Sequence, residues 1–266
     1  MTKLKKTLLA LSVIGLQACG GGGGSSTPAL SLESVQGVYD TTVYSGSGLG
    51  DATKAVRAVV LRDGVTWLFL RDGLVAANPS PVGVAKANVT VSGQSFSGSG
   101  KRYMLADNGS SNTLAVTGSV PATSTLGLSF SDSVGGTTTA TSTVGAVSRF
   151  NATAAKSDMA ATWTFSATQD AVGGGTVQVT WTWTVDANGT LSGSNTLGCD
   201  FTGTVLPRSE ALAVFDTTIN ESCAGTTRIF NGVAFQNSTK DLTTFGLILN
   251  DSSYGTVAEA VKVNPT

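Results

Sequence analysis

The 266-residue chain contains no histidine, and this absence removes more classes of function than any motif adds. Without histidine the chain cannot build a Ser-His-Asp triad, a Cys-His pair, a histidine-containing zinc helix or a histidine-ligated haem. Charged residues are also scarce, at 12% of the chain, whereas glycine contributes 33 residues. Because strong helix formers are few and threonine, valine and glycine are common, the composition predicts an all-β protein with short strands and glycine-containing turns.

Neither sign of charge dominates the chain. It has 16 basic and 17 acidic residues, and removal of Lys3, Lys5 and Lys6 leaves 13 against 17, a net charge of −4. Phosphate binding requires a clustered basic face, so we expect no nucleic acid partner. No pattern of residues predicts a cofactor or a metal.

The sequence also lacks an apolar run long enough to cross a membrane. The apolar run at 7–16 is ten residues long, follows the basic residues just named, and cannot span a bilayer core of about 30 Å. This pattern predicts an export signal. The run ends in Leu16-Gln17-Ala18-Cys19, which resembles the lipobox of bacterial lipoproteins. The resemblance implies a signal peptide over residues 1–18 and an acylated Cys19 as the mature N-terminus, anchored in a lipid bilayer.

Residues 19–30 follow as a glycine-rich and serine-rich stretch without apolar periodicity, typical of a flexible tether. A phosphate-binding loop is the alternative, but no strand precedes the glycines and no Lys-Ser or Lys-Thr pair follows them. Lipoproteins retained in the inner membrane commonly carry Asp after the acylated cysteine, whereas this chain has Gly20. The resemblance therefore implies the outer membrane, with the surface or periplasmic face left open.

Two of the three cysteines remain once Cys19 is acylated, namely Cys199 and Cys223. An oxidising compartment favours a disulfide between them. A redox-active or metal-binding pair is the alternative, but it lacks both the CxxC spacing and a histidine partner. We expect a structural disulfide.

The clearest strand covers Val177–Val185, where apolar and polar residues alternate. Its valines and the two tryptophans, Trp181 and Trp183, share one face, and its threonines share the other, so one face is expected to be buried. The strand ends in the hairpin signal Asp186-Ala187-Asn188-Gly189, for which a calcium loop is the alternative.

A second hairpin is predicted from Val56–Leu61 through Arg62-Asp63-Gly64 to Val65–Leu70. Both of its faces are apolar, which indicates either cover on both sides or a docking surface. Further strands are expected at Gln36–Tyr44, Ala85–Val91, Leu114–Val120, Leu126–Ser131, Thr162–Ala167, Cys199–Val205, Leu212–Ile219, Arg228–Gln236 and Thr243–Leu249. This many short strands indicates one or two small antiparallel barrels or sandwiches.

A weak internal similarity suggests two halves. The segment at 114–130 is similar to the segment at 199–215, which is compatible with a duplication. The low-complexity stretch Asp132–Val147 is expected to separate the halves, with β-domains at residues 31–150 and 151–266. No fixed repeat of 20 to 50 residues is present, which disfavours a β-solenoid.

A lipobox, a glycine-rich tether and β-barrels together resemble the surface lipoproteins related to transferrin-binding protein B and factor H-binding protein. The short segments at 59–69 and 198–208, together with Cys223, also resemble uncharacterised lipoproteins of Gram-negative bacteria. The resemblance implies architecture and location rather than a ligand. The better-known families bind host proteins or haem through loops, and no loop residue here matches theirs.

Candidate ligand-binding residues are few. Lys101, Arg102 and Tyr103 could bind an anion or a sugar, although a charged edge strand that prevents aggregation is the simpler interpretation. Trp181 and Trp183 could form a carbohydrate platform, but core packing is the simpler interpretation. Most acidic residues lie beside turns, and no spacing groups the exceptions, which are Asp170, Glu210, Asp216 and Glu221.

We therefore expect a non-enzymatic, outer-membrane-anchored lipoprotein that serves as a binding or envelope-structural module for a host protein, an envelope protein or a small ligand. One alternative is an exported hydrolase that works with paired carboxylates, which need no histidine. Another is a periplasmic partner in envelope assembly.

Overall fold

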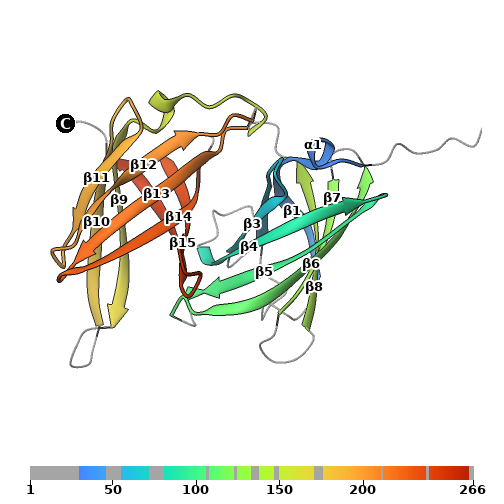
Figure 1. Cartoon of the computed structure of the whole chain (residues 1–266), viewed down its shortest axis with the longest axis horizontal. Coiled ribbons are helices and arrows are strands. Elements are labelled where there is room, and N and C mark those ends of the chain that lie inside the picture. The colour runs from blue at the N-terminus through green and yellow to red at the C-terminus, as the bar shows by residue number, and fades with distance from the viewer. Residues whose placement is uncertain are drawn as a thin grey trace, which may run out of the picture.

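The computed structural model describes residues 30–45, 55–71, 81–105, 108–122, 125–132, 138–146, 150–170, 176–210, 212–237 and 240–263. The expected signal peptide and Cys19 lie outside these residues. The chain forms two closed antiparallel barrels of eight strands each, which confirms the all-β prediction (Figure 1). No helix among the described residues is long and apolar enough to span a bilayer.

The first barrel is an up-and-down meander in which each strand pairs with the next along the chain. The final strand, β8, pairs with β1 and closes the sheet, for example at Tyr39 and Ala146. Its strands are β1 (Gly37–Ser45), β2 (Ala55–Val60), β3 (Val65–Arg71), β4 (Pro81–Ser92), β5 (Ser95–Met104), β6 (Ser111–Ala122), β7 (Thr125–Asp132) and β8 (Thr138–Ala146).

The second barrel repeats this connectivity. Its last strand, β16, pairs with β9 through Val261 and Thr164, so this sheet is also closed. Its strands are β9 (Ala161–Asp170), β10 (Thr176–Val185), β11 (Thr190–Asn195), β12 (Asp200–Pro207), β13 (Phe215–Cys223), β14 (Thr226–Gln236), β15 (Leu242–Leu249) and β16 (Gly255–Val263).

A single helical turn covers one end of each barrel. Helix α1 (Leu32–Val35) precedes β1, and the 3₁₀ turn η4 (Lys156–Met159) precedes β9. The last residue of each turn is buried in the core of its barrel, and its carbonyl accepts a hydrogen bond from an aromatic side chain four residues later. Tyr39 Oη donates to Val35 O at 2.8 Å, and Trp163 Nε1 donates to Met159 O at 3.0 Å. We call this the plugged end of each barrel.

The two barrels share connectivity, but the internal similarity seen in the sequence pairs the wrong strands. It aligned β6 and β7 with β12 and β13, whereas β4 and β12 hold equivalent places in the two meanders. Both of these strands make the same contact with a tight turn. The N–H of Val89 donates to Gly64 O and that of Val205 donates to Gly189 O, each at 2.8 Å. A chain rich in threonine and glycine contains the dipeptide Thr-Gly several times by chance, and this explains the false alignment.

The low-complexity stretch Asp132–Val147 was expected to separate the halves, and this expectation is wrong. Residues Thr138–Ala146 form β8, which pairs with β7 and with β1. Threonine and valine favour extended backbone, so a repetitive Thr-rich segment still makes a strand when two neighbours offer it hydrogen bonds. The chain passes from β8 to β9 through residues 147–160.

The turn at Asp186–Gly189 is a hairpin turn, as predicted. Asp186 Oδ1 accepts the N–H groups of Asn188 and Thr190, both at 2.8 Å, and Gly189 has φ of 85°. The bond from the Thr190 N–H is the main cause of a lowered pKa of Asp186. Within the described part of the chain, no group of three or more acidic or cysteine side chains is placed to hold a metal ion.

The alternation in β10 is resolved as expected. Trp181, Trp183 and Val185 point into the second barrel, while Thr182 and Thr184 face outward and are exposed. The interior is rich in aromatic rings. Phe165 stacks on Trp181 with centroids 4.8 Å apart, and Trp183 meets Phe245 edge-on at 5.3 Å. The tryptophans are therefore core residues, and the carbohydrate platform is wrong.

Replacing Trp183 with alanine is expected to lower the free energy of unfolding by about 3–5 kcal/mol, because it removes a large buried ring from this aromatic interior. Thr182→Ala, the adjacent outward position, serves as the matched control and should change stability by less than about 0.5 kcal/mol. Denaturant titration measures both. Equal effects of the two changes would contradict the assignment of the faces.

Candidate functional site: the junction and the loop end

The predicted ligand-binding triplet does not form one site. Lys101, Arg102 and Tyr103 lie in β5, which pairs with β4 on one side and β6 on the other, so the edge-strand interpretation is wrong. Successive side chains in a strand point to opposite faces. Arg102 is buried on the interior face of the first barrel, whereas Lys101 and Tyr103 point outward. Their outward side chains both donate to one carbonyl of the second barrel, Ser252 O, at 2.9 and 3.2 Å.

The outward faces of the two barrels pack against each other through an apolar cluster, which we call the junction. It explains the doubly apolar hairpin of β2 and β3. Leu68 and Leu70 face the interior of the first barrel, while Trp67 and Phe69 face the second barrel. The buried members of the junction are Val38, Val59, Leu61, Trp67, Phe69, Val84, Tyr103, Phe150, Leu212, Val214, Val233, Phe235, Ile248 and Val257.

Close approach at the junction depends on glycine. A Cβ atom at Gly246 would lie 2.7 Å from Phe69 Cε1, and one at Gly255 would lie 2.5 Å from Tyr103 Cγ. The Phe69 ring then meets Phe235 edge-on, with centroids 4.9 Å apart. These glycines let aromatic rings of the first barrel rest on the backbone of the second.

The junction includes buried charges of both signs. Arg57 forms two hydrogen bonds with Asp40, at 2.5 and 2.8 Å, within the first barrel. Arg71 reaches across to Glu259 of β16 at 2.5 Å and to the hydroxyl of Thr244. Both arginine side chains are about nine-tenths buried, with exposed fractions of 10% and 8%.

Burial lowers the pKa of Arg71, and the nearby Arg57 lowers it further, whereas Glu259 and Asp40 raise it. The guanidinium of Arg57 also lies over the rings of Phe150 and Phe235, at 5.6 and 5.1 Å from their centroids. A cation over an aromatic face gains electrostatic attraction when it is desolvated. Two cations and two anions thus balance within the junction.

A second polar contact joins the barrels at their plugged ends. Arg208, after β12, binds Glu210 and Asp216 at 2.6 and 2.5 Å and also reaches Asp63 of the first barrel at 3.2 Å. Although burial alone would lower the pKa of Arg208, hydrogen bonding to Glu210 and the charge of Asp216 raise it. The spacing of these carboxylates along the sequence gave no sign that they form a group. They are brought together in the folded chain because each of them binds Arg208.

The segment at 212–214 also differs from its prediction. It was expected to begin a strand at Leu212, but β13 begins at Phe215. Leu212 and Val214 instead bury their side chains in the junction, and the N–H of Ala213 donates to Phe150 O at 2.8 Å. An apolar run can belong to an interface as readily as to a strand.

Opposite the plugged ends, turns of the two barrels bond directly. Ser110 forms an isolated antiparallel bridge with Tyr254, and the N–H of Gly255 donates to Gly109 O at 2.9 Å. Figure 1 shows the β15–β16 turn beside the end of β5 in the lower half of the view, with α1 at the upper edge of the first barrel. We call this the loop end, defined by Leu105, Asn108–Ser110, Asn195–Cys199, Cys223–Thr226 and Asn250–Tyr254.

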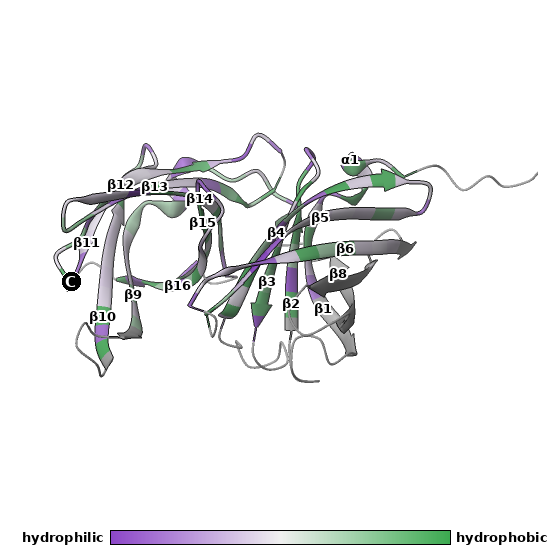
Figure 2. Ribbon diagram, turned by 60° about the horizontal axis from the view of Figure 1, so that its bottom comes forward, coloured by the Kyte–Doolittle hydropathy of each residue, from purple (hydrophilic) through white to green (hydrophobic). Residues whose placement is uncertain are grey.

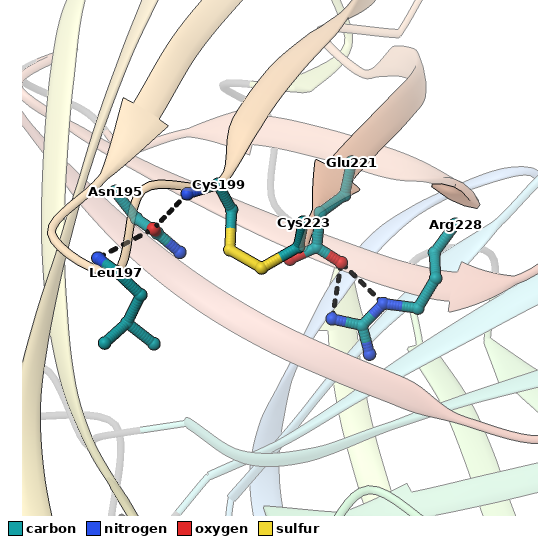
Figure 3. Close-up of a disulfide and its surroundings, with 6 residues drawn as sticks. All are labelled: Asn195, Leu197, Cys199, Glu221, Cys223 and Arg228. Atoms are coloured by element: carbon teal, nitrogen blue, oxygen red, sulfur yellow. Dashed lines mark hydrogen bonds and ion pairs between the residues drawn. A yellow bond between two sulfur atoms is a disulfide. The ribbon is translucent and has the colours of Figure 1, made fainter. Parts of the chain in front are cut away.

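The predicted disulfide lies at the loop end. Cys199 and Cys223 are bonded, with Cα atoms 4.4 Å apart, and connect the turn before β12 with the last residue of β13 (Figure 3). Asn195 Oδ1 accepts the N–H groups of Leu197 and Cys199, both at 3.0 Å, which fixes the first turn.

Beside the disulfide, the carboxylate of Glu221 is buried and bonded to Arg228, as Figure 3 also shows. The arginine is about half exposed and lies over the ring of Phe230. The sequence offered no sign of this pair, because its members are adjacent only through the register of β13 and β14.

Comparison with solved structures gives distant likenesses, and two of them are described here. No family model and no curated protein matches the chain. A candidate outer membrane protein from Bacteroides fragilis NCTC 9343 is 16% identical, with a TM-score of 0.31 over 87% of this chain and 99% of that one. Isotype 1 transferrin binding protein B from serogroup B Neisseria meningitidis is 10% identical, with a TM-score of 0.28 over 80% of this chain and 66% of that one.

Gly246→Ala is expected to destabilise the protein by about 1–3 kcal/mol, because the added methyl group forces Phe69 away from the junction. Gly127→Ala in β7 is the matched control, since its Cβ would meet only the atoms of Ser119 and first its movable hydroxyl. The midpoint of chemical denaturation measures both variants. If Gly246→Ala left the denaturation midpoint unchanged, the close approach of Phe69 to the backbone at this position would be contradicted.

Reduction of the disulfide is expected to lower the melting temperature. The closed loop of about 25 residues reduces the conformational entropy of the unfolded chain, and this raises the free energy of unfolding by about 3–4 kcal/mol. Mass spectrometry of the unreduced protein should recover one cross-linked peptide pair containing Cys199 and Cys223. Recovery of two freely alkylated thiols from envelope-derived protein would show that this bond is not formed.

Proposed function

We propose that this chain is an outer-membrane-anchored lipoprotein that acts as a non-enzymatic binding or envelope-structural module. The proposal joins the lipobox-like sequence at Leu16–Cys19, followed by Gly20, to a molecule made of two barrels fixed side by side. Two or more acyl chains on one cysteine give a lasting anchor.

The observation that carries the proposal is the place where the tether meets the fold. The N–H of Leu30 donates to Gly93 O at 3.1 Å, in the β4–β5 turn. This turn lies at the plugged end, where Leu30 and Leu32 also pack against the barrel core beside α1. The described part of the chain therefore begins at the plugged end, opposite the loop end.

The ion pairs favour a binding role over the hydrolase. A hydrolase of this kind needs two carboxylates that face one shared substrate site. Glu259 is paired with Arg71, Glu221 with Arg228, and both Glu210 and Asp216 with Arg208. These acidic side chains contribute to the fold and the junction.

The Cys19→Ser variant tests the anchor. It is expected to lose palmitate labelling and to leave the membrane fraction, whereas the Ser25→Cys variant, which adds a thiol further along the tether, should label as the parent does. Persistent labelling of Cys19→Ser would show that the lipobox interpretation is wrong.

Protease added to intact cells separates the two faces of the outer membrane. Digestion of the full-length protein indicates display at the cell surface, and protection indicates a periplasmic module. Both outcomes agree with the anchor. Recovery of the parent protein in the soluble fraction, without acyl groups, would contradict the proposed function as a whole.

A further inference from the structure

We propose that the plugged end lies against the headgroup layer of the phospholipid bilayer that holds the acylated Cys19, kept there by the short chain between them. The loop end is then directed away from the membrane. This inference rests on the proposed function, because the acyl chains supply the attachment. It adds the face of the folded body that meets the bilayer. Two lengths carry it: the reach of the chain before the fold, and the height of a barrel.

The reach of the chain is short. Leu30, the first described residue, stands eleven positions after Cys19. A chain spans at most about 3.3–3.6 Å per residue, so eleven residues reach about 36–40 Å at full extension, whatever their conformation. The average end-to-end distance of a glycine-rich chain of this length is only about 17–20 Å. The bilayer surface is therefore close to Leu30.

Leu30 is fixed to the plugged end. Its N–H donates to Gly93 O at 3.1 Å, in the β4–β5 turn. Ser31 and Ser34 cap helix α1 reciprocally, because the N–H of each donates to the hydroxyl of the other, at 3.0 and 3.2 Å. Leu30 and Leu32 also pack against the core of the first barrel. The start of the fold therefore cannot swing toward the loop end without losing these contacts.

The height of the first barrel follows from β4. This strand has 12 residues and runs from the loop end to the turn that holds Leu30. A strand rises about 3.3 Å per residue and tilts by about 35–45° in a barrel, so β4 covers about 30 Å along the barrel axis.

The two lengths decide which end meets the bilayer. For the loop end to touch the headgroups, the eleven residues would have to run back beside the barrel at close to full extension. Few conformations of a chain satisfy that condition, whereas many place the plugged end nearest the bilayer. The plugged end is therefore the favoured contact.

The turns at the plugged end carry ion pairs on their surface. Arg62, in the β2–β3 turn, binds Glu33 of α1 at 2.7 Å, and Lys240 binds Asp158 of η4 at 2.9 Å. Figure 2 shows hydrophilic colour in turns beside α1, whereas apolar colour runs largely along the strands. Anionic headgroups attract clusters of unpaired lysine and arginine, and a pair of opposite charges offers little of that attraction. The length of the chain, and not charge, therefore holds this end at the bilayer.

Quenching of a fluorescent label by nitroxide-bearing headgroups tests the inference. The acylated full-length protein is placed in phosphatidylcholine vesicles that carry the quencher, with a label at Ser95→Cys or Leu105→Cys. Both positions are exposed, and they stand at the two ends of β5, Ser95 at the plugged end and Leu105 at the loop end. The Ser95→Cys label should be quenched at least about threefold more strongly, because the other label lies about 25 Å farther from the headgroups.

A longer tether is the matched control. Insertion of about 40 glycine and serine residues after Gly24 raises the average reach of the chain to about 36–43 Å, which exceeds the height of the barrel. The difference in quenching between the two labels should then fall to less than half. A difference that persists with the longer tether would show that the turns bind the headgroups by themselves, and would overturn the role given to the chain length.

Equal quenching of the two labels in the parent protein, or stronger quenching at Leu105→Cys, would overturn the inference. Flotation of the same vesicles and palmitate labelling decide separately whether the anchor is intact. An acylated protein that floats with the vesicles but shows equal quenching refutes the orientation and leaves the lipoprotein assignment standing. A protein without acyl groups that does not float refutes both.

Discussion

The packing of outward-facing aromatic side chains of β3 onto the backbone of β15 is the constraint on which the rest of the molecule depends. Phe69 rests where Gly246 has no side chain, and Phe235 closes on it edge-to-face. Each barrel already has its own core, so this contact determines how the barrels sit relative to each other. The direct bonds between the turns of the two barrels at the loop end follow from that arrangement.

Apolar burial stabilises the junction, and its charges select one orientation. A large apolar side chain contributes about 1.5–3 kcal/mol when fully buried. A buried ion pair gains little over apolar residues of the same size, because desolvation offsets the attraction between its members. Arg71 and Glu259 contribute mainly by penalising other orientations, in which each charge would be buried without its partner.

The sequence predicted those elements whose structure depends on residues close to them along the chain. Alternation in β10 showed which face is buried, and the turn signal at Asp186–Gly189 marked its end. The two apolar faces of β3 indicated a second covering surface, although the pattern did not say that another barrel supplies it. The disulfide followed from the cysteine count and the predicted export.

The missed features depend on partners far along the chain. Strand β8 carries no apolar signal and exists because β1 and β7 both offer it hydrogen bonds. The role of Ser252 has no sequence signature, since only the backbone carbonyl at a left-handed residue is used. Alternation within β5 explains why Lys101, Arg102 and Tyr103 separate onto two faces, although they had been considered as one site.

The central claim is that the two barrels form one rigid body. Spin labels attached at Thr113→Cys and Thr202→Cys, both exposed on the outer walls, would report the distance between the barrels in the full-length protein. The native Cys199 and Cys223 are bonded to each other and do not take the label, and Cys19→Ser removes the third cysteine. The account predicts a single narrow distance distribution, whereas a broad or two-peaked distribution would show that the barrels move independently and would contradict it.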